Sequence, residues 1–272
     1  MTQPTILCDL SPHRPDPRTL LLYDRLDGRR RELDGLRPLA PDQAADLKRL
    51  YDLDLTYNSN AIEGSTLTYA ETRVILEQGI TVAGKPLREH LEVINHKEAI
   101  DFIEELAARG GGPMRESDLL SVHSLILRGI DPKNAGRYRT VPVGVRQGDG
   151  EIRHFCDPLQ VPLAMRAFLD WLGENGNHPV QKASEAHLHL VSIHPFIDGN
   201  GRTARLLMNL MLIQAGFPPA VVLVKRRLHY IEALESAQGG GERGPFLALI
   251  GAALDDSLTL YLDALGRGTR YL

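Results

Sequence analysis

The chain has 272 residues with a formal net charge of −4, and 43% of its residues are hydrophobic and 24% charged. These values are ordinary for a soluble globular protein, and the acidic balance argues against non-specific binding to nucleic acid. The two cysteines, Cys8 and Cys156, have no metal-ligand spacing and form no disulfide framework, which is typical of a protein in a reducing cytosol.

Residues 1–40 are rich in Pro, Asp and Arg. They lack a charged segment followed by an apolar one, so we expect no secretory signal and a cytoplasmic protein. The basic run at residues 29–31 is surrounded by Asp27, Glu32 and Asp34. These acidic neighbours favour a solvated turn over a nucleic-acid-binding patch.

The next element is a helix that we expect to begin at Pro41 and to end at Glu63 and Gly64. Gly64 would take the left-handed conformation that often follows a helix. A glutamate is disfavoured at this end because the helix dipole prefers cations there, so Glu63 is expected to pair with a group elsewhere. Thr68 and Glu71 then have the spacing of a capping box.

Two further helices are predicted over Ala70–Gln78 and Leu87–Ala108. His90 and His96 lie among charged neighbours in the second helix, so we expect them at the surface or partly packed. These helices could pack against a second copy of the chain, so a homodimer is one possible oligomeric state.

The run Gly110-Gly111-Gly112-Pro113 is the clearest break in the chain. We therefore place an N-terminal helical region at residues 1–112. A second helical domain is predicted at residues 113–265, followed by a tail at residues 266–272.

A β-hairpin is predicted between residues 138 and 155, with its turn at Asp149-Gly150. Its apolar residues alternate on one side, at Val141, Val143 and Val145. Pro142 lacks a backbone N–H, which suits an edge strand. Because an isolated hairpin is marginally stable, we expect this one to have a functional reason.

The rest of the chain has helical patterns, at Leu159–Leu172, Pro179–Ile193, Gly201–Ala215, Lys225–Ala237 and Pro245–Leu265. The third of these is apolar almost all round, which is typical of a helix at the centre of a bundle. Polar residues and prolines interrupt the apolar stretch at residues 206–224, so we expect no membrane span. The fold class predicted from these patterns is all-α with one hairpin.

Chemically distinctive residues gather at residues 193–205. His194 precedes Pro195, which disfavours the helical conformation, so the preceding helix should end there and leave the imidazole in a loop. Gly199 and Gly201 permit backbone geometries in which successive N–H groups surround an oxyanion. Unpaired N–H groups at the start of the following helix favour an anion as well.

The same stretch carries charged groups that suit a phosphate site. Asp198 offers a carboxylate that could hold Mg²⁺ when phosphates and waters complete the coordination shell. Arg202 and Arg205 lie three residues apart on one face of the following helix, as a pair of phosphate clamps. Two buried arginines are costly without an anionic partner, which a polyphosphate or Glu63 would supply. The sequence therefore predicts an active site here.

The run His-Pro-Phe-Ile-Asp-Gly-Asn-Gly-Arg-Thr-Ala-Arg at residues 194–205 matches the signature of the Fic (Fido) family at every position, and the chain resembles these enzymes. The resemblance implies a helical core with a small β-hairpin flap and an N-terminal helical region. It also implies a protein adenylyltransferase, which uses Mg²⁺ to transfer AMP from ATP onto a Ser, Thr or Tyr hydroxyl. The sequence does not identify the target protein, which includes the enzyme itself as a candidate.

The resemblance further implies roles for single residues. His194 is the base that accepts the proton of the target hydroxyl, and Asp198 holds the metal. The nucleotide phosphates are expected on Gly199, Asn200, Gly201, Arg202 and Arg205. From their positions in the chain, Tyr230 and Gln238 are the candidates for contact with the adenine. The flap residues that would align the target by strand addition are Thr140, Val141, Pro142 and Val143.

The segment at residues 59–64 resembles the inhibitory motif Ser-x-x-x-Glu-Gly of the same family, with Ser59, Glu63 and Gly64 at the motif positions. The resemblance implies that Glu63 pairs with Arg205, the second arginine of the signature, and so occupies the position of the γ-phosphate. Its place upstream of the core corresponds to family members with an N-terminal inhibitory helix.

Three alternative functions stay open. The first is transfer of another group, such as UMP, phosphate or phosphocholine, although the kinase-like branch replaces the second motif glycine, which is Gly201 here. The second is removal of AMP from a modified protein, with Glu63 orienting a water. The third is a non-catalytic module that binds a nucleotide or a partner, against which the presence of both His194 and Asp198 argues.

Overall fold

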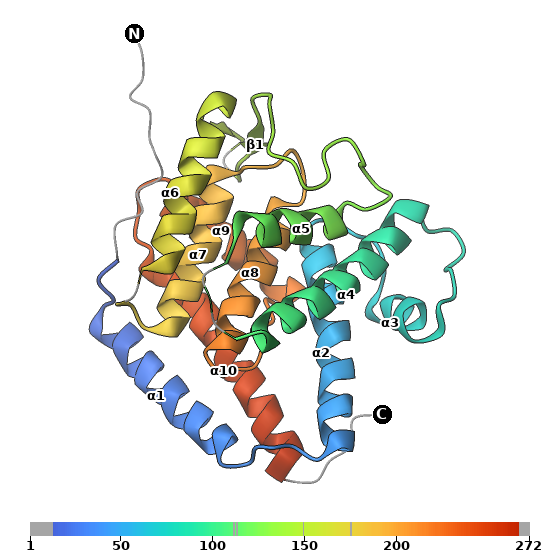
Figure 1. Ribbon diagram of the computed structural model, residues 1–272, viewed down its shortest axis with the longest axis vertical. Coiled ribbons are helices and arrows are strands. Elements are labelled where there is room, and N and C mark those ends of the chain that lie inside the picture. The colour runs from blue at the N-terminus through green and yellow to red at the C-terminus, as the bar shows by residue number, and fades with distance from the viewer. Residues whose placement is uncertain (1–12, 111, 113, 149, 175, 267–272) are drawn as a thin grey trace.

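The computed structural model describes residues 13–110, 112, 114–148, 150–174 and 176–266, and Figure 1 shows their arrangement. These residues form ten α-helices and one two-stranded antiparallel sheet, which confirms the predicted all-α class with a hairpin. The predictions for Cys8, for Asp149 in the hairpin turn, for a domain start at Pro113 and for the tail after Gly266 concern residues outside this set.

Each predicted helix is present, with its ends displaced by a few residues at most. The first five helices are α1 (Pro17–Asp34), α2 (Pro41–Ile62), α3 (Tyr69–Gln78), α4 (Leu87–Ala108) and α5 (Glu116–Ile126). The hairpin of β1 (Gly144–Arg146) and β2 (Ile152–His154) follows, and then the short 3-10 helix η1 (Pro158–Gln160). The remaining elements are α6 (Val161–Gly173), α7 (Pro179–Ile193), α8 (Asn200–Gln214), η2 (Val224–Arg226), α9 (Arg227–Gln238) and α10 (Gly244–Gly266).

Helix α8 lies at the centre of the bundle, where α4, α5 and α7 pack against it (Figure 1). Its buried apolar residues include Leu206, Leu207, Met208, Leu210 and Leu212, as the sequence pattern predicted. Helix α7, which directly precedes α8 in the chain, is also buried along most of its length. The loop between them, residues 194–199, is therefore anchored at both ends by the core.

Helix α1 corrects the solvated turn that was predicted for the basic run at residues 29–31. Asp16 caps this helix by accepting hydrogen bonds from the N–H groups of Arg18 at 2.7 Å and Thr19 at 3.1 Å. Arg29 donates to Asp255 of α10 at 2.8 Å, across 226 residues of sequence. Arg30 lies near Asp27 and Asp34 at the spacings i,i+3 and i,i+4, so the acidic neighbours of the run support a helix here instead of a turn.

The apolar side of α1 joins the core through Tyr23, Leu26 and Leu33, and its partner there is α10. Helix α10 is long and apolar enough to cross a membrane, judged by length and composition alone. In this structure half of its most apolar window is buried, and it packs against α1, α7 and α9. Within the described residues α10 is therefore a core helix of the bundle.

Helix α4 holds its two histidines inside the protein, which corrects their predicted surface position. His90 Nε2 accepts a hydrogen bond from the N–H of Val82 at 2.8 Å, so this side chain anchors the loop that enters α4. His96 lies with Nδ1 3.3 Å from the hydroxyl of Thr56 on α2. Their charged sequence neighbours lie on the outer side of the helix, which misled the prediction.

The hairpin is shorter than the predicted one. Its three-residue strands pair with Gly144 opposite His154, and Arg146 opposite Ile152. Gly150 takes a positive φ of 89° in the turn. The segment at residues 140–143 precedes β1 and does not belong to the ladder.

Candidate active site

His194 ends helix α7 in the left-handed conformation, with φ 53° and ψ 58°. The predicted end of the helix before Pro195 is confirmed, although the left-handed region replaces the extended one. His194 is the one residue other than glycine with a positive φ in the described part of the chain. This conformation costs about 1–2 kcal/mol, so the surrounding contacts must hold it.

Arg139 supplies those contacts. Its buried guanidinium donates from Nε to the carbonyl of His194 at 2.8 Å and from Nη2 to the carbonyl of Cys156 at 2.7 Å. Its own backbone N–H donates to the carbonyl of Pro195 at 2.9 Å. Arg139 therefore ties the loop to both sides of the hairpin. The role of Arg139 could not be predicted from the sequence, because a single arginine before a strand has no pattern that indicates it.

The His194 side chain is prepared to accept a proton. Its Nδ1 lies 3.2 Å from the carbonyl of Val191, which can only accept a hydrogen bond, so we assign the ring proton to Nδ1. Nε2 then carries the lone pair. The ring stacks on Phe155 with centroids 4.0 Å apart. Burial lowers the pKa of His194 to about 4, so the imidazole is neutral at pH 7.

His123 of α5 holds the middle of the loop. Its Nδ1 accepts a hydrogen bond from the N–H of Gly136 at 3.0 Å, which leaves the proton on Nε2. Nε2 then donates to the carbonyl of Asp198 at 2.9 Å. The ring also stacks on Phe196 with centroids 3.6 Å apart, and burial lowers its pKa to about 4. This positioning residue was likewise not found from the sequence.

Asn200 closes the loop on itself. Its side-chain oxygen accepts from the N–H of Phe196 at 3.0 Å, and its Nδ2 donates to the carbonyl of Phe196 at 2.9 Å. The amide predicted to hold a phosphate is therefore engaged in shaping the loop. A phosphate contact from the backbone N–H at this first position of α8 stays a prediction.

The two motif glycines are required for different reasons. Gly199 has a φ of 79°, as predicted for a left-handed position. Gly201 is helical instead, which corrects the prediction of special backbone geometry there. A Cβ atom at Gly201 would lie 2.4 Å from Oε1 of Glu63 and 3.1 Å from Nη1 of Arg205. A side chain at this position would therefore require the Glu63 carboxylate to move away from its present contact with Arg205.

Asp198 lies between two arginines. Its Oδ2 accepts from Arg88 Nη2 at 2.7 Å, and its Oδ1 accepts from the N–H of Gly199 at 2.6 Å and from Arg202 Nη2 at 3.4 Å. Burial works to raise the pKa of this carboxyl, but Arg202, the Gly199 N–H and Arg88 together lower it. Asp198 is therefore ionised at neutral pH.

The region of Asp198 fits a magnesium ion that is held mainly by a nucleotide. Among the described residues, no group of three His, Cys, Asp or Glu side chains could form an all-protein metal site. Mg²⁺ commonly binds through one or two carboxylates and completes its shell with phosphate oxygens and waters. One anionic, 43% exposed carboxylate beside the helix start where phosphates are expected meets this need.

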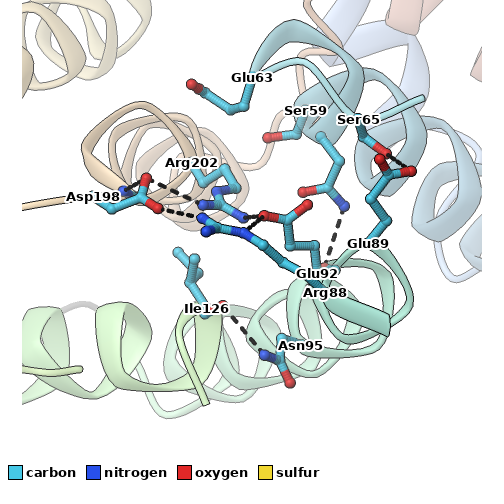
Figure 2. A network of polar contacts seen from close by, with 12 residues as sticks. Ser59, Glu63, Ser65, Arg88, Glu89, Glu92, Asn95, Ile126, Asp198 and Arg202 are labelled. Atoms are coloured by element: carbon cyan, nitrogen blue, oxygen red, sulfur yellow. Dashed lines mark hydrogen bonds and ion pairs between the residues drawn. The ribbon is translucent and has the colours of Figure 1, made fainter. Parts of the chain in front are cut away.

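The arginines of α8 face different acidic partners, although the sequence predicted a single pair of phosphate clamps. Arg202 is 2% exposed and lies between Asp198 and Glu92 of α4, with Nη1 3.3 Å from Glu92 Oε1 (Figure 2). Its buried Nε has no hydrogen-bond partner among the described residues. A buried donor of this kind favours an anion, because leaving it unpaired is unfavourable.

Arg205 faces the C-terminal end of α2. Its Nη2 donates to Oε1 of Glu63 at 2.7 Å and to the carbonyl of Ser59 at 2.9 Å, and its Nε donates to the hydroxyl of Ser59 at 3.0 Å. Burial acts to lower the pKa of Arg205, but Glu63 and Tyr230 raise it above its usual value. The predicted contact between Glu63 and Arg205 is thus present. Gly64 follows with the predicted positive φ, 103°.

The two candidates for the adenine contact lie in different settings. Tyr230 is 1% exposed, and its hydroxyl lies 3.4 Å from Nη1 of Arg205 and 2.9 Å from Nε2 of His187. In this structure Tyr230 is buried in contact with Arg205 and His187, and its contact with the adenine stays a prediction. Gln238 ends α9, and its carbonyl accepts from Arg153 of β2 at 2.9 Å. Its contact with the base stays a prediction.

The predicted flap residues border the catalytic loop. Thr140, Val141 and Pro142 are exposed, and Val143 is half-buried. The Val141 carbonyl accepts from Arg139 Nη1 at 3.2 Å, and the Val143 carbonyl accepts from the N–H of Phe155 at 3.4 Å. Arg139 and Phe155 also contact His194, so residues 140–143 and His194 are held by the same two residues.

Comparisons with known proteins identify the family to which the chain is similar. Residues 113–212 match the family model described as the Fic/DOC family. The chain is 35% identical over 244 residues to protein adenylyltransferase Fic of Nematostella vectensis, a match that spans 89% of this chain and 56% of the relative. It is 37% identical over 213 residues to protein adenylyltransferase fic-1 of Caenorhabditis elegans, spanning 77% and 41%. The chain therefore spans about half the length of these curated relatives.

Two solved structures are similar over most of the chain. Fic-1 of C. elegans has a TM-score of 0.80 and 32% identity, covering 93% of this chain and 74% of that chain. A Fic domain-containing signaling protein of Bacteroides thetaiotaomicron has a TM-score of 0.82 and 28% identity, covering 92% and 99%.

Proposed function

Because this chain belongs to the Fic/DOC family, we propose that it transfers AMP from ATP onto a hydroxyl group of a target protein. The shared name of its curated relatives, protein adenylyltransferase, supports this activity. The observation that carries the proposal is the placement of His194, a neutral imidazole with its lone pair assigned to Nε2, at the end of α7 and within electrostatic range of Asp198 and Glu63.

The polyphosphate of ATP binds over the first turn of α8. The unpaired N–H groups of a helix start attract anions, and the unpartnered Nε of Arg202 adds a charged donor. His194 Nε2 accepts the proton of the target hydroxyl while the hydroxyl oxygen forms a bond to the α-phosphorus. The bond from the α-phosphorus to the bridging oxygen breaks, and pyrophosphate leaves with that electron pair. Arg202 stabilises the charge that develops on it.

Asp198 is the residue that would hold Mg²⁺ in this reaction. The ion, when bound, neutralises charge on the phosphates and fixes their orientation. Arg88 and Arg202 keep Asp198 in its ionised form, which is the form a metal needs. The side chain of His123 fixes the backbone carbonyl of the same residue.

The largely exposed segment at residues 140–143 is the proposed binding site of the target segment. An extended target segment that pairs with this backbone would enter beside Phe155, which stacks on His194. Such pairing would hold the target through backbone hydrogen bonds and would place the side-chain hydroxyl of the target near His194.

Glu63 keeps the enzyme in an inhibited state. Its carboxylate occupies the space next to Gly201 and engages Arg205, so that Arg205 is not available to the γ-phosphate. The Glu63 side chain is 40% exposed and lies at the end of α2, where it can turn away without unfolding the core. AMP transfer then requires that Glu63 release Arg205.

The activity is tested by incubating the protein with ATP labelled at the α-phosphate or at the γ-phosphate, and separately with α-labelled UTP and CTP. AMP transfer places label on protein only from α-labelled ATP. The variant His194→Ala should lose about 10²–10⁴-fold in rate and keep its nucleotide affinity within a few fold, because a base acts on the chemical step. Label from γ-labelled ATP would instead indicate phosphate transfer, and undiminished transfer by His194→Ala would refute the mechanism.

A further inference from the structure

Arg88 on α4 reaches the proposed metal-binding carboxylate from a helix outside the signature. Its Nη2 donates to Oδ2 of Asp198 at 2.7 Å, across 110 residues of sequence, and its Nε donates to Oε1 of Glu92 at 3.1 Å (Figure 2). The Arg88 side chain is 58% exposed, so it approaches Asp198 from the solvent side.

The position of Arg88 within its own helix is unfavourable. It is the second residue of α4, where the positive end of the helix dipole disfavours a cation. The order of the pair Arg88 and Glu92, with the base on the N-terminal side, is also the weaker of the two orders at this spacing. The contact with Asp198 therefore accounts for the placement of this side chain better than any local preference.

The contacts of Arg88 complete a ring of four alternating charges with Glu92, Arg202 and Asp198. The inner pair, Arg202 and Glu92, is 2% and 13% exposed, and the outer pair, Arg88 and Asp198, is 58% and 43% exposed. The outer pair can therefore separate in water while the inner pair stays in place. Of the two carboxylate oxygens of Asp198, Oδ1 faces the loop and Arg202, and Oδ2 faces Arg88.

We propose that Arg88 is the counter-cation of Asp198 in the nucleotide-free enzyme, and that it must leave Oδ2 before a divalent cation can bind there. Arg88 thereby sets the magnesium concentration that the enzyme requires. The inference rests on the proposed function, since it takes Asp198 as the metal-binding residue. It concerns a pair separate from Glu63 and Arg205, so the two contacts act on different parts of the bound nucleotide.

The test is a magnesium titration of nucleotide binding, read by the fluorescence of a labelled ADP. ADP lacks the γ-phosphate that would meet Glu63, so the inhibitory contact does not enter the measurement. The variant Arg88→Gln should lower the Mg²⁺ concentration at half-maximal binding about threefold to tenfold, because an exposed ion pair and the repulsion between two cations are both removed. ADP affinity in EDTA should fall by no more than about threefold, because the only loss there is the compensation of the Asp198 charge by an exposed cation. Arg88→Lys, which keeps the charge, should resemble the parent.

The matched control is Arg109→Gln at the C-terminal end of the same helix, where the arginine contacts Glu105 at 3.5 Å. At 1.5 Å per residue it lies roughly 30 Å along the helix axis from Arg88. It changes the net charge equally and should leave the titration unchanged. An unaltered magnesium midpoint in Arg88→Gln would overturn the proposal. A loss of ADP affinity in EDTA greater than about tenfold in Arg88→Gln would overturn it too, because Arg88 would then be a direct phosphate ligand. No ADP binding by the parent at any magnesium concentration would reject the proposed function itself.

Discussion

Glu63 and Arg205 are 142 residues apart in the sequence, yet a carboxylate oxygen of Glu63 lies 2.7 Å from Nη2 of Arg205. Ser59, one helical turn before Glu63, adds its hydroxyl at 3.0 Å and its carbonyl at 2.9 Å. The end of α2 therefore offers three acceptors to one guanidinium. In the proposed mechanism each of them holds Arg205 away from the γ-phosphate.

Ser59→Ala should weaken this hold without abolishing it. One hydrogen bond to Arg205 is lost, while the contacts to Glu63 and to the backbone carbonyl stay. We expect AMP transfer at saturating Mg²⁺–ATP to rise about threefold to tenfold, since one hydrogen bond makes a net contribution of roughly 0.5–1.5 kcal/mol. Ser65→Ala is the control, because the Ser65 hydroxyl contacts Glu89 instead. A rate at or below that of the parent would contradict the role of Ser59.

Arg139→Lys tests whether the backbone of His194 needs its support. Lysine keeps the charge but cannot reach the carbonyls of His194, Val141 and Cys156 together. We expect the rate of AMP transfer to fall at least about tenfold, because small displacements of a reacting group are costly. Labelled ADP should bind within about threefold of the parent, since the phosphate site is on α8. Arg137→Lys, at an exposed position two residues earlier, should change neither value. Equal loss of binding and rate in Arg139→Lys would indicate general misfolding.

The pH profile of transfer should reflect the burial of His194. A base must be unprotonated, and burial lowers the pKa of His194 to about 4 from its ordinary value. The rate kcat/KM should therefore stay level as the pH falls from about 7.5 to 5.5, and decline only at lower pH. Phe155→Ala exposes the ring, which raises the pKa and moves the decline to higher pH. Phe155→Leu keeps an apolar cover and should retain the parent profile. A parent profile that already declines near pH 6.5 would refute the burial effect.

The sequence predicted the residues of this site better than their geometry. The signature located the loop, and the unfavourable charge of Glu63 at a helix end predicted its need for a partner, which proved to be Arg205. The tight turn at Gly199 followed from the residue type. The role of Gly201 could not be predicted from its residue type, because it depends on the close approach of Glu63 from a helix that is distant in the sequence.

The supports of the site could not be predicted for a related reason. Arg88, His123 and Arg139 have the local patterns of ordinary surface or helix residues, and they contact the loop only after the fold brings α4, α5 and the hairpin together. Helix α1 was missed because its core partner, α10, lies at the other end of the chain. Local periodicity therefore predicted the helices, while contacts between residues distant in the sequence determine which residues support the site.

In the proposed regulation, AMP transfer begins only when Glu63 releases Arg205. If the competent form is only ~1% populated, productive affinity falls about a hundredfold, which is roughly 2.7 kcal/mol. Glu63→Gly removes the carboxylate and should raise AMP transfer toward that limit, including transfer onto the enzyme itself. Arg205→Ala also breaks the ion pair, but it should not raise transfer, because the same side chain is needed to hold the nucleotide.

The most direct measurement compares the rate at which the parent, Glu63→Gly and Arg205→Ala incorporate label from α-labelled ATP into protein at saturating Mg²⁺–ATP. We expect a rate for Glu63→Gly at least about tenfold above the parent, and a rate for Arg205→Ala no higher than the parent. Equal or lower incorporation by Glu63→Gly would contradict the account and leave Glu63 as an ordinary helix end or a residue that orients water.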